Sequence, residues 1–222
     1  KAQGGAVPSN VAAAPEGVTP TVEHAAVAAT LALGALRVIL LGALAQHHAA
    51  YSELRALATA LAGATGAQLG FLPEGGNAVG AALAGVLPHR AAGGRAVVAP
   101  GLNAVEMLGA RLKAYVLVGG IEAADLVPSS TIEASLRGAY CVVAITPYAS
   151  EEILAHAHVI LPSAVFAETS GTWVNVEGRW QSVAGVSKPA GEARPAWKIL
   201  RVLGNLLGLA GFEYVSSEEV RD

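Results

Sequence analysis

The stretch Cys141–Ile145 reads Cys-Val-Val-Ala-Ile, and the stretch Tyr115–Val118 reads Tyr-Val-Leu-Val. Apolar runs without polar alternation are typical of parallel strands, because both faces of such strands are covered. We therefore predict a parallel sheet of about five strands with these two near its centre. The other predicted strands are Arg37–Leu41, Ala67–Leu72 and His158–Leu161.

Helical patterns separate the predicted strands. In the segment Ala49–Ala62 the apolar residues recur on one helical face, and Gly63 is the predicted end of that helix. Shorter helices are predicted at Asn77–Leu87, Val105–Arg111, Thr131–Arg137 and Ser150–Ala155. Strands that alternate with helices predict an α/β fold: a doubly wound, mostly parallel sheet with helices on both faces.

The residue composition and the order of the predicted elements also predict how the chain is divided. Residues 1–21 are rich in Gly, Ala, Pro and Ser and are predicted to be a linker or extended arm. Residues 22–161 are predicted to form a Rossmann-like α/β domain. Residues 162–222 are predicted to complete the same domain with a polar hairpin and a C-terminal helix. That helix begins at Pro195 and is expected to pack on the sheet through Trp197, Leu200 and Leu203.

Composition excludes several classes of function. The chain has 222 residues, 53% of them hydrophobic and 14% charged, with a formal net charge of −3. A weakly acidic chain without basic clusters offers no footprint for nucleic acid. Cys141 is the only cysteine, so the chain alone can hold neither a disulfide framework nor an iron–sulfur cluster. The apolar stretch Ala25–Ala45 contains Arg37, and we interpret it as a buried helix and strand rather than a membrane span.

Nucleotide, metal and hydrolase motifs are incomplete. Gly75 and Gly80 have the spacing of P-loop glycines, but Ala81 stands where the phosphate-binding lysine should be. His156 and His158 could point the same way from an extended segment, yet no third ligand has a supporting spacing. We therefore predict no catalytic residue and no metal ligand in this chain.

The segment Glu168–Gln181 concentrates polar side chains between apolar stretches. One interpretation is a hairpin whose polar groups satisfy one another, with Asn175 and Thr172 bonding backbone and Glu177 and Arg179 pairing locally or with another element. The other is a polar cradle for a ligand, with Arg179 as the contact to an anion. The residues alone leave both interpretations open.

The stretch Ala157–Arg179 reads A-H-V-I-L-P-S-A-V-F-A-E-T-S-G-T-W-V-N-V-E-G-R. It closely resembles the A-D-x-x-L-P-x-x-x-x-x-E-x-x-G-T-x-x-N-x-E-G-R pattern of the molybdopterin oxidoreductase superfamily. The likeness continues through Gln181, Pro189 and the stretch Gly191–Leu200, and His158 stands where that pattern has Asp. Segments Leu40–His48, Gly76–Gly80, Leu203–Leu209 and Tyr214–Asp222 resemble the family of large iron–sulfur subunits of bacterial NADH-quinone oxidoreductase, complex I.

This resemblance implies an oxidoreductase role in the respiratory chain. Catalytic members of the superfamily use such an α/β domain to line a bis-pterin molybdenum cofactor, whereas the large complex I subunit carries no molybdenum. The resemblance to the complex I subunit implies that this segment is a cofactor-free scaffold. It also implies that the parent subunit holds 4Fe-4S and 2Fe-2S clusters elsewhere, through which electrons pass from NADH toward quinone. The vestigial pterin-side candidates are Glu168, Thr172, Asn175, Glu177 and Arg179.

The resemblance also implies partners and a location. The expected partners are the other subunits of the complex I peripheral arm, without nucleic acid and without direct membrane insertion. The expected location is the cytoplasmic face of the bacterial inner membrane, as part of a peripheral membrane complex. Two alternatives stay open: a cofactor-binding domain of an active molybdopterin oxidoreductase, and a free-standing nucleotide-binding or partner-binding domain.

Overall fold

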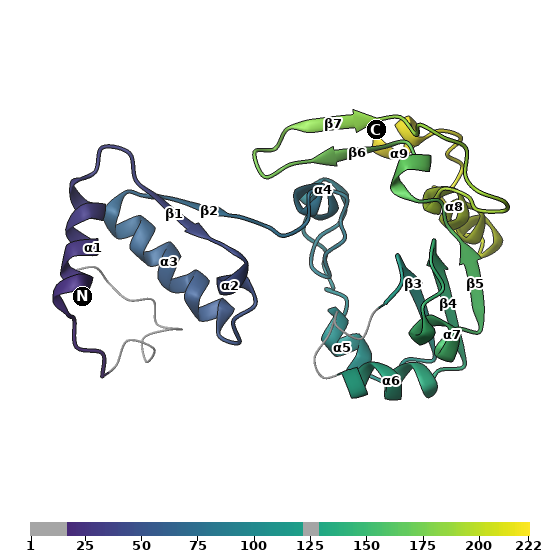
Figure 1. Ribbon diagram of the computed structural model, residues 1–222, viewed down its shortest axis with the longest axis horizontal. Coiled ribbons are helices and arrows are strands. Elements are labelled where there is room, and N and C mark those ends of the chain that lie inside the picture. The colour runs from purple at the N-terminus through teal and green to yellow at the C-terminus, as the bar shows by residue number, and fades with distance from the viewer. Residues whose placement is uncertain (1–16, 122–128) are drawn as a thin grey trace. The chain divides into compact units, whose positions relative to one another are not determined.

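The computed structural model describes residues 17–121 and 129–222. Two compact units are present: the first ends at Ala78, and the second runs from Val79 to Asp222 (Figure 1). This boundary falls inside the range 22–161 that the sequence assigns to one domain, and those domain limits stay a prediction. Most of the predicted N-terminal arm, residues 1–16, lies outside the described residues.

The first unit contains one parallel β-α-β arrangement. Its elements are α1 (Val22–Leu33), β1 (Val38–Leu41), α2 (Ala43–Gln46), α3 (Tyr51–Thr65) and β2 (Gln68–Phe71). Strands β1 and β2 pair in parallel from Val38 opposite Gln68 to Leu41 opposite Phe71. The predicted helix end at Gly63 is wrong: α3 continues to Thr65, and Gly66 ends it with a φ of 69°. Glycine suits that position because side chains disfavour the left-handed conformation.

Arg37 ties the pieces of the first unit together. Its Nε donates to the carbonyl of Gly34 after α1, and its Nη1 donates to the carbonyl of Thr65 at the end of α3. The last carbonyls of a helix have no partner within the helix, so a cationic donor there satisfies them and complements the helix dipole. Arg37, the one charged residue of the apolar stretch 25–45, therefore connects the end of α3 to the start of β1 through its hydrogen bonds.

The second unit contains a three-stranded parallel sheet and an antiparallel hairpin. The sheet has the order β3-β4-β5, and the hairpin pairs β6 with β7. Its elements are α4 (Ala78–Leu83), which begins at the unit boundary, 3-10 helix η2 (Ala92–Gly94), α5 (Ala104–Gly109), β3 (Ala114–Val118), α6 (Ser129–Arg137), β4 (Cys141–Thr146), α7 (Glu151–His156), β5 (Val159–Pro162), 3-10 helix η3 (Phe166–Glu168), β6 (Gly171–Val174), β7 (Trp180–Val183), α8 (Ala196–Leu206) and α9 (Ser217–Arg221).

The main core lies between this sheet and helices α5 and α6 (Figure 1). Its buried members are Leu108, Tyr115, Ile132, Leu136, Ala139 and Val142. Tyr115 lies opposite Val142 in the register of β3 and β4, so both point to the same helices. Its hydroxyl donates to the carbonyl of Met107 at 3.0 Å, which satisfies the polar end of a buried ring.

The α/β fold with parallel sheets is confirmed, but the predicted single five-stranded sheet is not. The five predicted strands are present, divided between the sheet of the first unit and that of the second. Strand β4 is central and buried, whereas β3 is an edge strand on which Val116 and Val118 are 50% and 55% exposed. An apolar run reveals a strand that favours burial, but it does not show which neighbours cover it.

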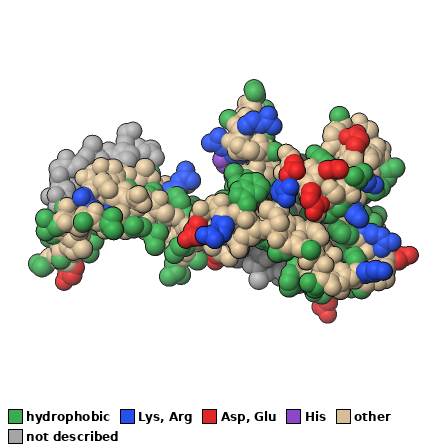
Figure 2. All heavy atoms as spheres, turned by 90° about the horizontal axis from the view of Figure 1, so that it is seen from above, with side chains coloured by type: hydrophobic (Ala, Val, Ile, Leu, Met, Phe, Trp, Pro, Cys, Tyr) green, Lys and Arg blue, Asp and Glu red, His purple; other side chains and the backbone are tan. Residues whose placement is uncertain are grey.

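Apolar side chains also spread over the visible surface (Figure 2). In the first unit Leu33, Leu36 and Leu44 are 86% to 97% exposed. No helix within residues 17–121 or 129–222 has the length and apolar character needed to cross a bilayer. Exposed apolar surface is typical of proteins that meet partners, because contiguous patches are otherwise disfavoured in water.

Candidate functional site

The predicted polar hairpin is present, and two of its candidate side chains bond within it. Asn175 Oδ1 accepts the backbone N–H groups of Glu177 at 3.1 Å and Arg179 at 2.9 Å, which closes the turn between β6 and β7. Thr172 Oγ1 lies 2.9 Å from Ser182 Oγ across the two strands. Asn175 thus bonds backbone as expected, whereas Thr172 bonds a side chain.

The charged candidates of the hairpin behave differently from the expectation. Glu177 and Arg179 are exposed near the turn. Within residues 17–121 and 129–222 neither side chain forms an ion pair or hydrogen bond, so the predicted pairing is wrong. Solvent satisfies these charges, because water solvates an exposed ion at little cost.

Glu168 is the candidate that lies in a pocket. It belongs to η3, and its carboxylate oxygen accepts the backbone N–H of Val165 at 3.2 Å. Of the five candidates from the resemblance, only Glu168 lines this pocket. The five side chains therefore do not form one cradle, and the residues present do not fit a pterin held by all of them.

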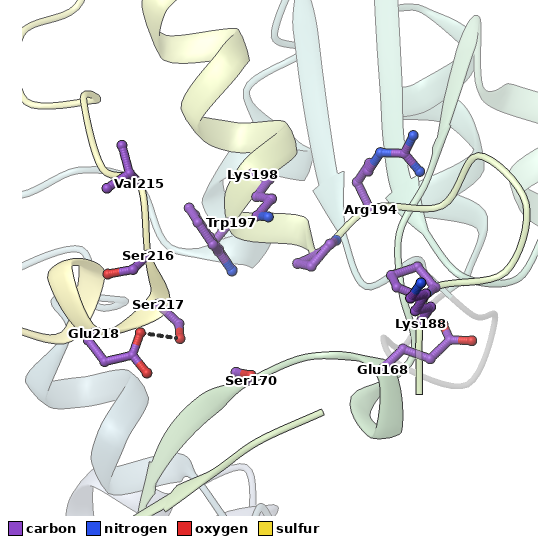
Figure 3. A pocket seen from close by; sticks show the side chains of 12 residues that line it. Glu168, Ser170, Lys188, Arg194, Trp197, Lys198, Val215, Ser216, Ser217 and Glu218 are labelled. Atoms are coloured by element: carbon purple, nitrogen blue, oxygen red, sulfur yellow. Dashed lines mark hydrogen bonds between the residues drawn. The ribbon is translucent and has the colours of Figure 1, made fainter. Parts of the chain in front are cut away.

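The pocket has a volume of about 590 Å³ and is built by three segments of the second unit (Figure 3). The segments are the η3–β6 turn, the stretch from Lys188 into α8, and the start of α9. The lining residues are Glu168, Ser170, Lys188, Pro189, Arg194, Pro195, Trp197, Lys198, Val215, Ser216, Ser217 and Glu218. This volume lies within the range of sites that take small ligands or peptide side chains.

Trp197 and Lys198 project from the first turn of α8 toward this space (Figure 3). Lys198 Nζ lies 5.3 Å from the centroid of the Trp197 ring, which is a cation–π contact. The sequence predicted that Trp197 packs on the sheet. Helix α8 contacts β4 of the sheet, Leu200 and Leu203 are half-buried, and Gly204 is its buried residue. Trp197 is half-buried as well and lines the pocket, and its packing on the sheet stays a prediction.

The pocket has mixed charge with an excess of cations: Lys188, Arg194 and Lys198 against Glu168 and Glu218. Glu218 lies in the first turn of α9, and its own backbone N–H lowers the pKa of its carboxyl below the ordinary value, helped by the Ser217 hydroxyl. That hydroxyl donates to Glu218 Oε2 at 3.0 Å. At neutral pH Glu218 is therefore ionised and already holds hydrogen bonds.

The three cations were missed by sequence reasoning, although a signal was available. The stretch Lys188–Lys198 places three basic residues within eleven positions, in a chain with 14 Lys and Arg in all. One of the two open interpretations made Arg179 the anion contact, but Arg179 does not line the pocket. Which cation reaches a cavity depends on how loops fold onto one another, and local spacing does not show this.

His156 and His158, which were considered as a ligand pair, line a second pocket of about 540 Å³ together with Glu133 and Arg137. His158 Nδ1 accepts the backbone N–H of Val142 at 3.1 Å, so this side chain joins β5 to β4. An Asp carboxylate can accept the same N–H, which explains how His158 replaces the Asp of the superfamily pattern. No group of three or more potential metal-binding side chains occurs among the described residues.

Most of the chain matches a family of known proteins. The family model described as molybdopterin oxidoreductase matches residues 22–206. The chain belongs to the molybdopterin oxidoreductase family. A solved structure, the acetylene hydratase of Pelobacter acetylenicus, is similar over 55% of this chain and 18% of its own, with a TM-score of 0.48 and 20% identity.

Curated relatives match shorter segments of the chain. The mitochondrial NADH-ubiquinone oxidoreductase 78 kDa subunit of Candida albicans is 49% identical over 51 residues, 23% of this chain and 7% of its own. The NADPH-Fe(3+) oxidoreductase subunit alpha of Geobacter sulfurreducens is 34% identical over 96 residues, 43% and 11% of the two chains. The nitrate reductase of Synechocystis is 38% identical over 74 residues, 33% and 10%. The matches thus span about a tenth of these relatives or less.

Proposed function

We propose that this molybdopterin oxidoreductase domain is part of the large iron–sulfur subunit of an NADH-quinone oxidoreductase, and that it serves there as a cofactor-free structural scaffold. The 49% identity to the 78 kDa subunit of Candida albicans supports this proposal. The segments that resemble the large complex I subunit, Leu40–His48, Gly76–Gly80, Leu203–Leu209 and Tyr214–Asp222, support it as well.

The observation that carries the scaffold role is the use of the superfamily's polar motif by the hairpin itself. Asn175 accepts two backbone N–H groups, and Thr172 bonds Ser182. A polar group with internal partners gains little from a ligand, because binding would have to replace hydrogen bonds that already exist. Thr172 and Asn175 therefore stabilise the β6–β7 hairpin instead of forming a ligand site.

The proposal includes the setting of the parent subunit. Iron–sulfur clusters, 4Fe-4S and 2Fe-2S, lie in other parts of that subunit and carry electrons from NADH toward quinone. The neighbours of this domain are other subunits of the peripheral arm, at the cytoplasmic face of the bacterial inner membrane. Exposed apolar residues such as Leu36 and Val98 support a role in contacts with neighbouring protein.

The reading frame that encodes this domain tests the assignment to the large complex I subunit. We expect a ferredoxin-type cysteine pattern far upstream, since the clusters need about four thiolates each. An upstream region with one cluster motif and a Cys, selenocysteine, Ser or Asp metal ligand would assign the domain to an active molybdenum enzyme instead.

Ligand titration tests the scaffold role directly. We expect no heat of binding when the 222-residue chain is titrated with a guanine nucleotide or a pterin dinucleotide, and no stoichiometric molybdenum in elemental analysis. Micromolar binding that is lost in Glu168→Gln but kept in Arg179→Gln would contradict the scaffold role and locate the ligand in the pocket.

The second candidate is a cofactor-binding domain of an active molybdopterin oxidoreductase. The similarity to the nitrate reductase of Synechocystis and the presence of a 590 Å³ pocket favour it. The same titration separates the two candidates, because the second requires a pterin-binding surface.

A further inference from the structure

We propose that the pocket between η3, the stretch Lys188–Lys198 and α9 binds an acidic peptide segment of a neighbouring polypeptide, whose carboxylates meet Lys188, Lys198 and Arg194. This proposal rests on the scaffold function, since a scaffold in a multisubunit assembly needs sites at which neighbours dock. It adds the site and the chemistry of the partner.

The pocket is lined by three cationic and two anionic side chains, and the two carboxylates already accept hydrogen bonds. The carboxylate of Glu168 accepts the N–H of Val165, and that of Glu218 accepts the hydroxyl of Ser217. The ion pairs within residues 17–121 and 129–222 are His47–Glu74, Glu133–Arg137 and Arg221–Asp222, so they include neither pocket lysine. Arg194 Nη1 donates to the carbonyl of Ala193 at 2.8 Å. The two carboxylates stay charged, so the pocket has a one-charge excess of cations, and this excess favours an anionic ligand.

The directions of the cations favour an extended ligand with several anionic groups. Figure 3 shows Lys198 pointing down from α8, Lys188 on the side of Glu168, and the guanidinium of Arg194 turned away from both. Charges that do not converge cannot all contact one phosphate or one carboxylate. A peptide with carboxylates spaced along its backbone can reach each of them.

The exposure of the cations leads to the same class of ligand. Lys188, Arg194 and Lys198 are exposed side chains. A single exposed ion pair contributes little, because water and salt screen it. Several such contacts on one chain add up, since the first holds the others in place.

The apolar lining suggests what separates the carboxylates. Trp197 is half-buried in the pocket wall, and Val215, which is 70% exposed, lines the same pocket. Tryptophan is enriched among the residues that carry most of the energy of protein interfaces. The hydroxyls of Ser170 and Ser216 lie around the same space. These features fit a segment in which acidic residues flank an apolar side chain.

Binding of a defined probe tests the proposal. The probe is the capped peptide acetyl-Glu-Glu-Leu-Glu-Glu-amide, titrated calorimetrically into the 222-residue chain in about 50 mM salt, where screening is weak. We expect binding that the double variant Lys188→Gln/Lys198→Gln weakens about tenfold. The variant Arg179→Gln is the matched control: it removes an exposed cation outside the pocket and should bind like the parent chain.

Unchanged circular dichroism and melting of the double variant show that the fold is kept, as expected for two exposed side chains. The proposal is overturned if the parent chain does not bind the peptide, if acetyl-Gln-Gln-Leu-Gln-Gln-amide binds equally, or if the double variant binds as tightly as the parent. Tighter binding of inorganic phosphate than of the peptide also overturns it, because the site would then serve a small anion.

The failure of this inference is distinguishable from that of the scaffold function. Silence with the peptide, the guanine nucleotide and the pterin dinucleotide removes the docking site and leaves the scaffold role standing. Pterin binding in the same pocket contradicts both.

Discussion

Strands β1 and β4 have similar sequences and different surroundings. Both are apolar runs, Val-Ile-Leu-Leu in β1 and Cys-Val-Val-Ala-Ile-Thr in β4. Val38 and Leu40 of β1 are each 55% exposed, whereas Val142 and Ile145 of β4 are fully buried. The difference lies in coverage: β4 has a strand on each side and helices against its faces, while β1 has one neighbouring strand.

The interior of each unit is accordingly stabilised in a different way. Among the described residues of the first unit, the buried ones are Ala58, Ala62 and Thr65, whereas the second unit has a cluster with Leu136 and Val142 at its centre. Arg37 links α3 to the start of β1 in the first unit through hydrogen bonds to main-chain carbonyls. Similar apolar strands can thus depend on a polar contact in one unit and on an apolar core in the other.

Truncation of a core leucine should have the largest effect. Leu136 is 1% exposed, so Leu136→Ala is expected to lower the free energy of unfolding of the second unit by about 2–5 kcal/mol, through lost transfer energy and a cavity. The matched control is Leu33, which is 86% exposed on α1. Leu33→Ala should change the free energy of unfolding of the first unit by less than about 0.5 kcal/mol. Urea unfolding measures both. Equal losses would contradict the contrast between the units.

Removal of the Arg37 guanidinium should have the next largest effect, and it should be confined to the first unit. Arg37→Met keeps much of the apolar stem and leaves the carbonyls of Gly34 and Thr65 without this donor. Hydrogen bonds to charged groups contribute about 1.5–3 kcal/mol, and a loss of that size is expected. Hydrogen exchange of the amides of α3 and β1 should speed up while those of β4 stay protected. Unchanged exchange in α3 would show that Arg37 is not the link.

Replacing a glycine by alanine should change stability in opposite directions in the two units. A Cβ at Gly204 would lie 2.3 Å from Cδ1 of Phe212, so Gly204→Ala should destabilise the second unit by about 1–3 kcal/mol through overpacking. Gly63 lies inside α3 with open space around it, and Gly63→Ala should stabilise the first unit by about 0.5–1 kcal/mol.

Thermal melting of both variants measures these signs. The double variant Gly204→Ala/Phe212→Ala should be less impaired than the two single changes added together, because Phe212 no longer meets the new methyl group. Strict additivity would contradict the contact between α8 and the C-terminal segment.

The strands were predictable because apolar runs bounded by glycine or proline are local signals. Strand β2 was predicted at Ala67–Leu72 and occurs at Gln68–Phe71. The division into two sheets was not predictable, since it depends on which strand edges meet in space. The end of α3 was placed at Gly63 because glycine often ends helices, but Gly66 has the left-handed φ and Gly63 does not.

The candidate site was predictable where a bond is local and not where it is tertiary. Asn175 binds N–H groups two and four residues away, which is ordinary chemistry for asparagine in a turn. Lys188 and Glu218 share a pocket although thirty positions separate them, so only the folded chain reveals it. Arg179 looked like an anion contact by its position in the motif, yet it is exposed at the hairpin.

The smallest effect is expected at His158, where the fold tolerates a departure from the superfamily pattern. Its Nδ1 accepts the N–H of Val142 and thereby ties β5 to the central strand of the second unit. His158→Ala should lower the free energy of unfolding by about 0.5–1.5 kcal/mol, the usual contribution of one hydrogen bond. Hydrogen exchange should also speed up at the Val142 amide alone. A general loss of packing would instead speed up exchange at many amides.

The matched variants are His158→Asn and His158→Asp. The Oδ1 atom of either side chain is as many bonds from Cα as the Nδ1 of histidine, so each can accept the Val142 N–H from the same backbone position. Both are expected to restore the parent stability within about 0.5 kcal/mol and to slow the exchange of that amide again. Restoration by Asp but not by Asn would show that a neutral acceptor at this position is not sufficient, and that the histidine of the parent chain contributes by more than this hydrogen bond. Restoration by neither would show that the imidazole ring acts through packing beside Leu136 in the second pocket, and the explanation of this departure from the pattern would be wrong.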